Sequence, residues 1–267
     1  MNPFFPVREY LQWLLRSRTR HGVHSPFVYR FLDECLYRET DKSLFEIPEN
    51  HRIKLKKDPS ILEYTDPGAG SRKHKIKITH KNNKKYKLRQ IARNSLQKPR
   101  YCRLFYRMIQ HFGFRSVLEM GTSLGITTSY MSLAGNHVMI DTIEGAYPIA
   151  DLAEKYFTEN GFTNICLHRG NFDQKLDEVI TNKKYDLIFI DGNHRGNKTL
   201  DYFQKLSKHI NEQGVIILDD IRWSESMLEA WQNIKMHPDV TISIDLFRIG
   251  MVFFDKRFTK EEFAIRF

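Results

Sequence analysis

A chain of 267 residues that is 41% hydrophobic and 13% aromatic can bury a full core, which excludes a disordered protein by composition. Its longest apolar runs, such as residues 187–190 and 215–218, are far too short to cross a bilayer, and we find no signal peptide. We therefore expect a cytoplasmic protein without a membrane span. Its three cysteines, Cys35, Cys102 and Cys166, lack the spacing of a zinc site or a disulfide framework, so we expect buried thiols.

The formal net charge of +10 comes from one segment of the chain. Residues 52–107 hold 18 lysines and arginines against three acids, whereas the rest of the chain has a slight excess of acids. Such a run is usually a solvated surface. The alternative is a binding face for RNA or for an anionic acceptor molecule, because clustered positive charge attracts phosphate groups without reading a sequence. Both interpretations stay open at this point.

The N-terminal part of the chain predicts two amphipathic helices, near residues 7–18 and 27–38, joined by a polar connector. Their apolar faces contain Trp13, Leu14, Phe27, Phe31 and Leu32. Residues at helical spacing pack onto a neighbouring domain more often than onto a membrane, so we expect packing. We place the domain boundary after residue 98, with an extension at 1–98 that covers or builds the acceptor site and a catalytic domain at 99–267.

After residue 99, short apolar runs alternate with helical patterns, which is typical of a parallel sheet covered by helices. The predicted strands are residues 116–120, 137–143, 163–168, 185–190, 214–218, 240–246 and 248–254. The predicted helices are residues 125–134, 147–160, 173–181, 197–210 and 224–236. The last two strands are too close in sequence for a parallel crossover, so we expect them to form an antiparallel hairpin. The sequence therefore predicts an α/β, Rossmann-like fold with seven mostly parallel strands.

The first predicted strand ends in a loop that can hold a ligand. The loop has the pattern E-x-G-x-x-x-G-x-[ST], and its residues are Glu119, Gly121, Thr122, Ser123, Gly125 and Thr127. Backbone amides in a glycine-containing turn before a helix can approach a ligand closely. The residue two positions after Gly121 is Ser123, so the loop is not the G-x-G-x-x-G of a dinucleotide site.

This loop and the reversed strand resemble the class I S-adenosylmethionine-dependent methyltransferases, and motif I looks like that of the catechol and caffeoyl-CoA type O-methyltransferases. The resemblance covers residues 99–267. It implies that the loop residues bind S-adenosylmethionine, with Gly121 against its methionine part and Thr127 near its carboxylate. Uncharacterised bacterial relatives with this architecture resemble the chain also in an HGVHSPF element at residues 21–27 and a GAGS element at residues 68–71. These elements hint at a role near the active site, which the sequence alone does not establish.

A second glycine pattern, Asp66-Pro67-Gly68-Ala69-Gly70-Ser71, fits a ligand loop by letters alone. Five basic residues follow it among the next few positions, and no apolar helix face appears. Without a strand, a turn and a helix in succession, these glycines indicate only a turn.

Further cofactor residues are expected at the ends of the second and third strands. Glu144 lies 23 residues after Gly121, close to the spacing at which an acid accepts hydrogen bonds from ribose hydroxyls. The alternative role of Glu144 is to stabilise a helix N-terminus. Asn171 and Phe172 stand where the resemblance places residues against the adenine ring, although Phe172 suits a core position nearly as well.

Three acids end the fourth and fifth predicted strands: Asp191, Asp219 and Asp220. Carboxylates that converge at one sheet edge need a cation or a shared proton. The arrangement resembles the Mg²⁺ site of the catechol-type enzymes, and oxygen ligands also suit Mn²⁺ or Ca²⁺. The resembling enzymes usually have asparagine in place of Asp220, which leaves a metal-free site open. Asp191 is also expected beside the cofactor.

His194, three residues after Asp191, is the candidate general base, because histidine can take up a proton near neutral pH. Its alternatives are capping the next helix or binding the cofactor. We therefore predict an S-adenosylmethionine-dependent enzyme, most simply an O-methyltransferase assisted by Asp191 and His194 and by Mg²⁺ if a metal binds. An RNA methyltransferase and a non-catalytic nucleic-acid-binding protein are the alternatives. The sequence identifies neither the acceptor nor the oligomeric state.

Overall fold

The parallel strands predicted after residue 99 form in the computed structural model, which describes residues 4–64 and 84–267. The chain divides into two compact units, one of Met1–Arg38 with Lys183–Phe267 and the other of Glu39–Asn182. The predicted boundary after residue 98 lies inside the second unit, and as a functional division it stays a prediction. None of the described helices is long and apolar enough to span a membrane.

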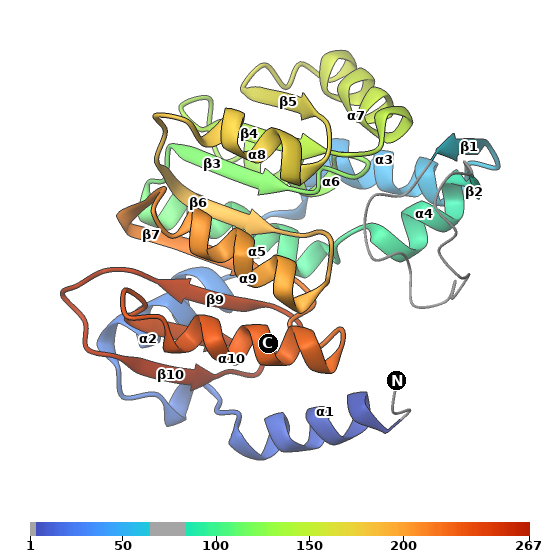
Figure 1. Ribbon diagram of the computed structural model, residues 1–267. Coiled ribbons are helices and arrows are strands. Elements are labelled where there is room, and N and C mark those ends of the chain that lie inside the picture. Colours follow the sequence, from blue (N-terminus) through green and yellow to red (C-terminus); the bar gives the residue numbers. More distant parts are fainter. Residues whose placement is uncertain (1–3, 65–83) are drawn as a thin grey trace. The chain divides into compact units, whose positions relative to one another are not determined.

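The sheet of the Glu39–Asn182 unit consists of three parallel strands: β3 (Ser116–Met120), β4 (Met139–Glu144) and β5 (Ile165–Arg169). β4 pairs with both of the others, through Val117↔Ile140 and Ile140↔Ile165. Each strand is followed by a helix: α6 (Ile126–Ser132), α7 (Tyr147–Glu159) and α8 (Phe172–Ile180). Helices α7 and α8 pack along β4 and β5 (Figure 1). The predicted alternation of strands and helices is confirmed.

The strands of the other unit lie in the order β10, β8, β9, β7, β6. Their bounds are β6 (Tyr185–Ile190), β7 (Ile210–Leu218), β8 (Ile242–Asp245), β9 (Gly250–Phe253) and β10 (Glu261–Ala264). β6 and β7 are parallel, whereas β9 is antiparallel to both β7 and β8, which confirms the predicted hairpin. Helix α9 (Gly196–Leu206) follows β6 in the chain, and helix α10 (Glu225–Met236) follows β7. The mixed α/β, Rossmann-like fold is therefore as predicted, with β10 as an addition.

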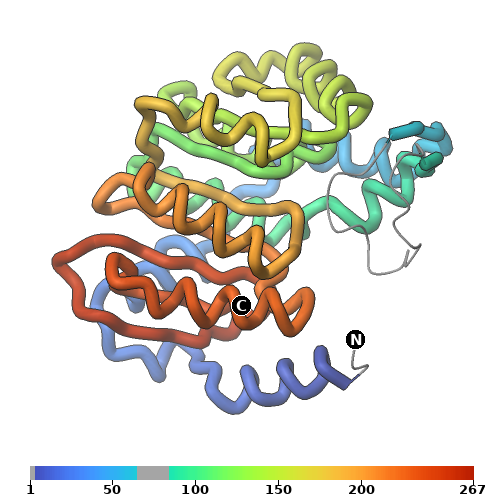
Figure 2. Tube along the Cα trace, in the orientation of Figure 1, coloured from blue at the N-terminus to red at the C-terminus, as the bar shows by residue number. Residues whose placement is uncertain are grey.

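The two N-terminal helices pack onto the C-terminal strands of their own unit. α1 (Phe5–Arg16) is followed by α2 (Pro26–Phe31) and a π-helical turn (Leu32–Leu36). The Trp13 indole donates to the Asp245 carbonyl (3.2 Å), and the Phe27 ring meets the Phe253 ring edge-on at 5.2 Å. The segment after α1 lies beside the C-terminal segment, because Arg18 pairs with Ile265, and in Figure 2 the blue tube of the N-terminal helices runs beside the red tube of the C-terminal strands. The two helices therefore pack onto the C-terminal strands, as predicted. This packing explains their aromatic faces and Phe27, the phenylalanine of the HGVHSPF element.

Three helices and a hairpin precede β3 in the second unit: α3 (Glu46–Lys57), β1 (Ile61–Tyr64), β2 (Lys84–Lys87), α4 (Leu88–Ser95) and α5 (Pro99–Phe112). The β1–β2 hairpin lies inside the basic segment, where we expected no strand. The GAGS element lies outside the described residues.

A buried arginine anchors α3 to α5. The Arg52 side chain is 3% exposed and donates to Glu49 (2.8 Å), to the Gln97 carbonyl (2.7 Å) and to the Cys102 thiol (3.7 Å). The Tyr130 hydroxyl of α6 donates to the same Glu49 carboxylate (2.7 Å). Because a buried charge is costly unless it is paired and hydrogen-bonded, this network fixes the three helices together.

The cysteine prediction is correct for Cys35 and Cys102 and wrong for Cys166, which is exposed. Cys166 lies on β5, which among the described strands pairs with β4 alone. The sequence shows the strand but not its place at the sheet's edge, so the exposed thiol was not foreseen.

Candidate functional site

The loop between β3 and α6 has the backbone shape that its glycines suggest. Gly121, Ser123 and Gly125 all adopt positive φ, at 109°, 48° and 78°. A Cβ atom on Gly125 would lie 2.7 Å from the Phe157 ring, so glycine is required by both conformation and space. The Gly121 N–H donates to the carbonyl of Ile143 (2.9 Å), which ties the loop to the end of β4.

Glu119 is a fully buried carboxyl group beneath this loop. One of its oxygens, Oε2, accepts hydrogen bonds from the hydroxyls of Thr128 (2.5 Å) and Thr142 (2.6 Å). The Thr122 and Thr142 hydroxyls are 2.6 Å apart, so Thr122 extends the network. Within the described part of the chain, Glu119 Oε1 has no hydrogen-bond partner. Burial raises the pKa of Glu119 to about 7, against the effect of the two hydroxyl donors.

Glu144, at the carboxyl end of β4, connects the loop to α7. Its Oε2 accepts a hydrogen bond from the Ser123 N–H and its Oε1 accepts one from the Ala146 N–H, each at 2.8 Å. The position at a strand end next to the glycine loop is the one predicted for the ribose-binding acid.

The other predicted cofactor residues of this unit also have structural roles. The Asn171 side chain caps α8 by accepting from the Asp173 N–H (3.0 Å), and Phe172 is half-buried at the start of α8. Thr127 is 7% exposed, and its side chain hydrogen-bonds with Cys102 in the interior. Burial raises the pKa of the Cys102 thiol to about 11. The structure thus links Glu119 to Thr122 through Thr142, and Ser123 to Glu144 directly, whereas Thr127 contacts the core.

In the unit that contains β6 and β7, the three predicted acids gather around an arginine. Arg248 donates to both oxygens of Asp219, at 3.1 and 2.9 Å, and its Nε lies 3.2 Å from Asp220 Oδ1. Asp219 is 2% exposed. Burial and the neighbouring Asp219 raise the pKa of Asp191 well above its ordinary value, although Arg248 acts in the opposite direction. Burial disfavours the charge of Arg248, but Asp219 and Asp220 outweigh it and raise the pKa of the guanidinium.

His194 lies near the acids but is too far from Asp191 for a hydrogen bond. Its Nε2 is 3.9 Å from Asp191 Oδ1, and its ring is tilted against Trp223 with centroids 5.4 Å apart. Asn193 and His194 both have positive φ, at 63° and 27°, and Asp220 has a φ of 50°. Non-glycine residues held in this region are strained, and such strain concentrates at functional sites.

Arg248 is the functional residue that sequence analysis missed. It occupies the turn between β8 and β9, and only the antiparallel pairing of β9 with β7 brings this turn to the carboxyl end of β7. The predicted hairpin could have indicated this, because a basic residue in its turn would meet the acids that follow β7.

A groove of about 720 Å³ lies on α3, α4 and α7 of the second unit and includes His51, whose ring stacks on Tyr156 at 3.8 Å. Burial and the nearby Lys54 lower the pKa of His51 to about 4. None of the groove's lining residues is a predicted site residue, so it does not mark the cofactor site.

Residues 118–221 match the methyltransferase-domain family. Comparison with curated proteins gives no match. Among solved structures, the fold is similar to an O-methyltransferase from Bacillus cereus in complex with SAH, with 17% identity and a TM-score of 0.54, covering 85% of this chain and 97% of that one. It is also similar to the O-methyltransferase TomG from Streptomyces achromogenes in complex with SAM, with 16% identity and a TM-score of 0.52, covering 62% and 86%.

At these identities the structural likeness concerns the fold. Together with the family match, it confirms the resemblance to class I methyltransferases that motif I and the reversed strand indicated. The roles of the individual site residues stay predictions.

The raised pKa of Glu119 predicts a pH-dependent stability. In the unfolded chain this carboxyl loses its proton near pH 4.5, whereas in the folded chain it keeps it up to about pH 7. The free energy of unfolding should therefore fall as pH rises between these values, by about 3 kcal/mol in total. Urea titrations from pH 4.5 to 8 measure the free energy of unfolding of the wild type and of Glu119→Gln. The variant should lack the fall that the wild type shows with rising pH. Parallel curves would show that Glu119 is not protonated in the folded chain.

Replacing Glu144 should weaken the binding of S-adenosylhomocysteine. Loss of hydrogen bonds to a charged group typically costs about 1.5 to 3 kcal/mol. Glu144→Ala also removes the carboxylate that accepts from the Ser123 N–H of the loop. Calorimetric titration measures the affinity, with Glu159→Ala, an exposed acid at the end of α7, as the matched control. Equal affinity in both variants would remove Glu144 from the cofactor site.

Proposed function

We propose that this chain, with a methyltransferase domain at residues 118–221, transfers a methyl group from S-adenosylmethionine to an oxygen atom of a small-molecule acceptor. The observation that carries the proposal is the Glu144 carboxylate at the carboxyl end of β4, whose Oε2 accepts a hydrogen bond from the Ser123 N–H of the glycine loop. A ribose with two hydroxyl donors is the ligand that such a group suits.

The residues of the second unit fit the cofactor. Glu144 would accept from the ribose hydroxyls, and the loop at Gly121 and Ser123 would bring backbone atoms against the methionine part. Phe172 is half-buried at the start of α8, and we assign contact with the adenine ring to it. Glu119 holds β3, β4 and α6 together beneath the loop and has a structural role in this proposal.

When bound, S-adenosylmethionine supplies a methyl group on a positively charged sulfur, which an acceptor oxygen can displace in line. The chain has then to orient the acceptor and to remove its proton. We assign proton removal to His194, and we assign orientation of the acceptor hydroxyl to Asp191. Burial and the neighbouring Asp219 raise the pKa of Asp191, which favours its protonated form.

The Mg²⁺ site that the resemblance implies at Asp191, Asp219 and Asp220 does not fit the donor set. Both Asp219 oxygens accept from Arg248, and the same guanidinium lies against Asp220. An Arg–carboxylate pair of this bidentate kind is strong and geometrically specific, and it already compensates the acids' charge. We therefore propose that Arg248 takes the place of a metal and that the reaction is independent of divalent cations.

The acceptor remains unidentified, and nothing in the described residues favours RNA. Lys84, Lys85 and Lys87 of the basic segment belong to β2, which is directly followed by α4. Part of the positive charge therefore lies on the small β1–β2 hairpin. An anionic small molecule is compatible with this segment, and both the RNA contact and the cytoplasmic location stay predictions.

A methyl-transfer assay tests the proposed function. The full chain is incubated with S-adenosylmethionine that carries a labelled methyl group and with small phenols, carboxylic acids or RNA, each with Mg²⁺ and with EDTA. We expect transfer to a small hydroxyl-containing acceptor at the same rate in both conditions. His194→Gln should lower kcat by about 10² to 10⁴. Transfer to RNA alone, or activity that EDTA abolishes and Mg²⁺ restores, would contradict the proposal.

The pairing of Arg248 with Asp219 also predicts a large effect on stability. Arg248→Gln leaves a buried carboxylate without its partner and should lower the free energy of unfolding by about 3 to 5 kcal/mol. Adding Asp219→Asn to that variant should recover much of the loss, because the uncompensated charge is then gone. Urea denaturation of the wild type, both single variants and the double variant completes the cycle. Strictly additive losses would show that the two side chains do not interact.

A further inference from the structure

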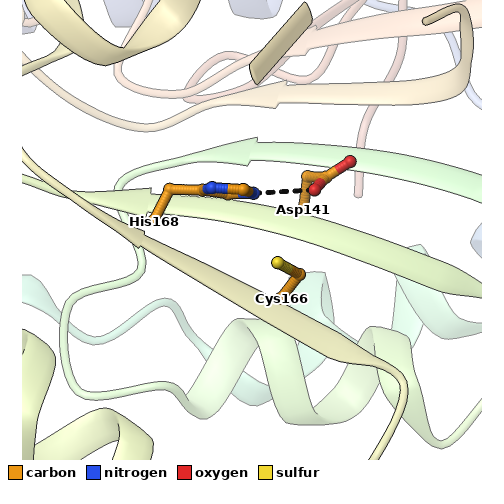
Figure 3. Close-up of side chains that lie close together, drawn as sticks. All are labelled: Asp141, Cys166 and His168. Carbon is orange, nitrogen blue, oxygen red and sulfur yellow. Dashed lines mark hydrogen bonds and ion pairs between the residues drawn. The ribbon is translucent and has the colours of Figure 1, made fainter. Parts of the chain in front are cut away.

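Three chemically different side chains meet on one face of β4 and β5. Asp141 of β4 pairs in register with Cys166 of β5, and His168 is two residues further along β5, so Cys166 and His168 share a face. Figure 3 shows the three side chains directed toward a common point. The placement follows from strand register, so the sequence alone does not reveal it.

The donor atoms of this cluster are close together. His168 Nε2 lies 2.7 Å from Asp141 Oδ1, and one oxygen, one nitrogen and the sulfur all lie within 4.8 Å of one another. The His168 and Asp141 side chains are 21% and 13% exposed, and Cys166 is exposed. An ion from solvent can therefore reach all three, while two of them are largely held in place by the sheet.

The distances suit a tetrahedral ion after small adjustments. Metal–ligand lengths of about 2.0 to 2.3 Å place the donors of a tetrahedral zinc site about 3.3 to 3.6 Å apart. The His168–Asp141 separation would have to widen by about 0.7 Å, and the thiol would have to approach by at most about 1.5 Å, which rotation of an exposed side chain allows.

We propose that Asp141, Cys166 and His168 bind a zinc ion, with water in the fourth position. The donor set of nitrogen, sulfur and oxygen selects a borderline-soft ion such as Zn²⁺ and not Mg²⁺ or Ca²⁺, which prefer oxygen ligands. Binding releases the thiol proton, and the resulting thiolate and carboxylate offset the charge of the ion.

The site would cross-link β4 to β5 just before the residues assigned to the cofactor. Asp141 is three residues from Glu144, and His168 is three residues from Asn171. The proposal does not depend on the methyltransferase activity, because its geometry involves neither the glycine loop nor the acids of the other unit. Zinc binding would stabilise the folded chain, since the paired strands that assemble the ligands exist only there.

Metal titration of the full chain tests the proposal. After treatment with chelator, the protein is titrated with Zn²⁺ against a coloured competitor, and separately with Co²⁺, whose thiolate complex has a charge-transfer band in the near ultraviolet. We expect one Zn²⁺ per chain and the cobalt band in the wild type. Because loss of an outer-shell partner of a metal site already costs about 10- to 100-fold, Cys166→Ser and His168→Gln should each weaken Zn²⁺ binding by about 100-fold or more.

The matched control is His137→Gln, an exposed histidine in the same unit, which should bind Zn²⁺ like the wild type. Cys166→Ser should also lose the cobalt band. Absence of Zn²⁺ binding by the wild type would overturn the proposal. So would binding that Cys166→Ser and His168→Gln leave unchanged, because the ion would then be held elsewhere. The cobalt spectrum of the wild type shows by itself whether a thiolate binds the metal, without relying on any variant.

Discussion

A carboxyl group at the end of a buried strand must have its charge satisfied, and the proposed site follows from how this chain meets that constraint. Glu119 is satisfied by two threonine hydroxyls and a raised pKa, and Glu144 by two backbone N–H groups. Asp219 is satisfied by the Arg248 guanidinium. These three solutions determine which acids hold the fold and which can still bind a ligand.

The consequences for function differ between the acids. Glu119 is enclosed, so it serves the architecture of the loop, whereas Glu144 lies at the end of β4, where our proposal assigns the ribose to it. Both Asp219 oxygens accept hydrogen bonds from Arg248, and in our proposal this guanidinium takes the place of a cation. A fixed guanidinium supplies positive charge without exchange with solvent, and preorganised charge of this kind is an effective way to stabilise charge during a reaction.

Local patterns predicted the strands, the loop from Glu119 to Gly125 and the C-terminal hairpin, because apolar runs and turn residues are properties of neighbours in sequence. The pairing of strands that are far apart in the chain is not a property of neighbours in sequence. Arg248 reaches Asp219 because β9 pairs antiparallel with β7, and Cys166 lies beside Asp141 because β5 pairs with β4. β10 escaped notice because its four residues include Glu261 and Glu262, and its partner β8 is nearly 20 residues earlier. The pairing of Arg248 with Asp219 and Asp220, which bears on the metal site implied by the acids, is likewise a long-range contact.

Calorimetric titration of the full chain with S-adenosylhomocysteine, and in parallel with NAD, tests the central claim most directly. A loop with Ser123 at the position of the second dinucleotide-binding glycine, and Glu144 bonded to it, predicts one S-adenosylhomocysteine site per chain and no heat with NAD. NAD binding, or the absence of any S-adenosylhomocysteine binding, would contradict the account.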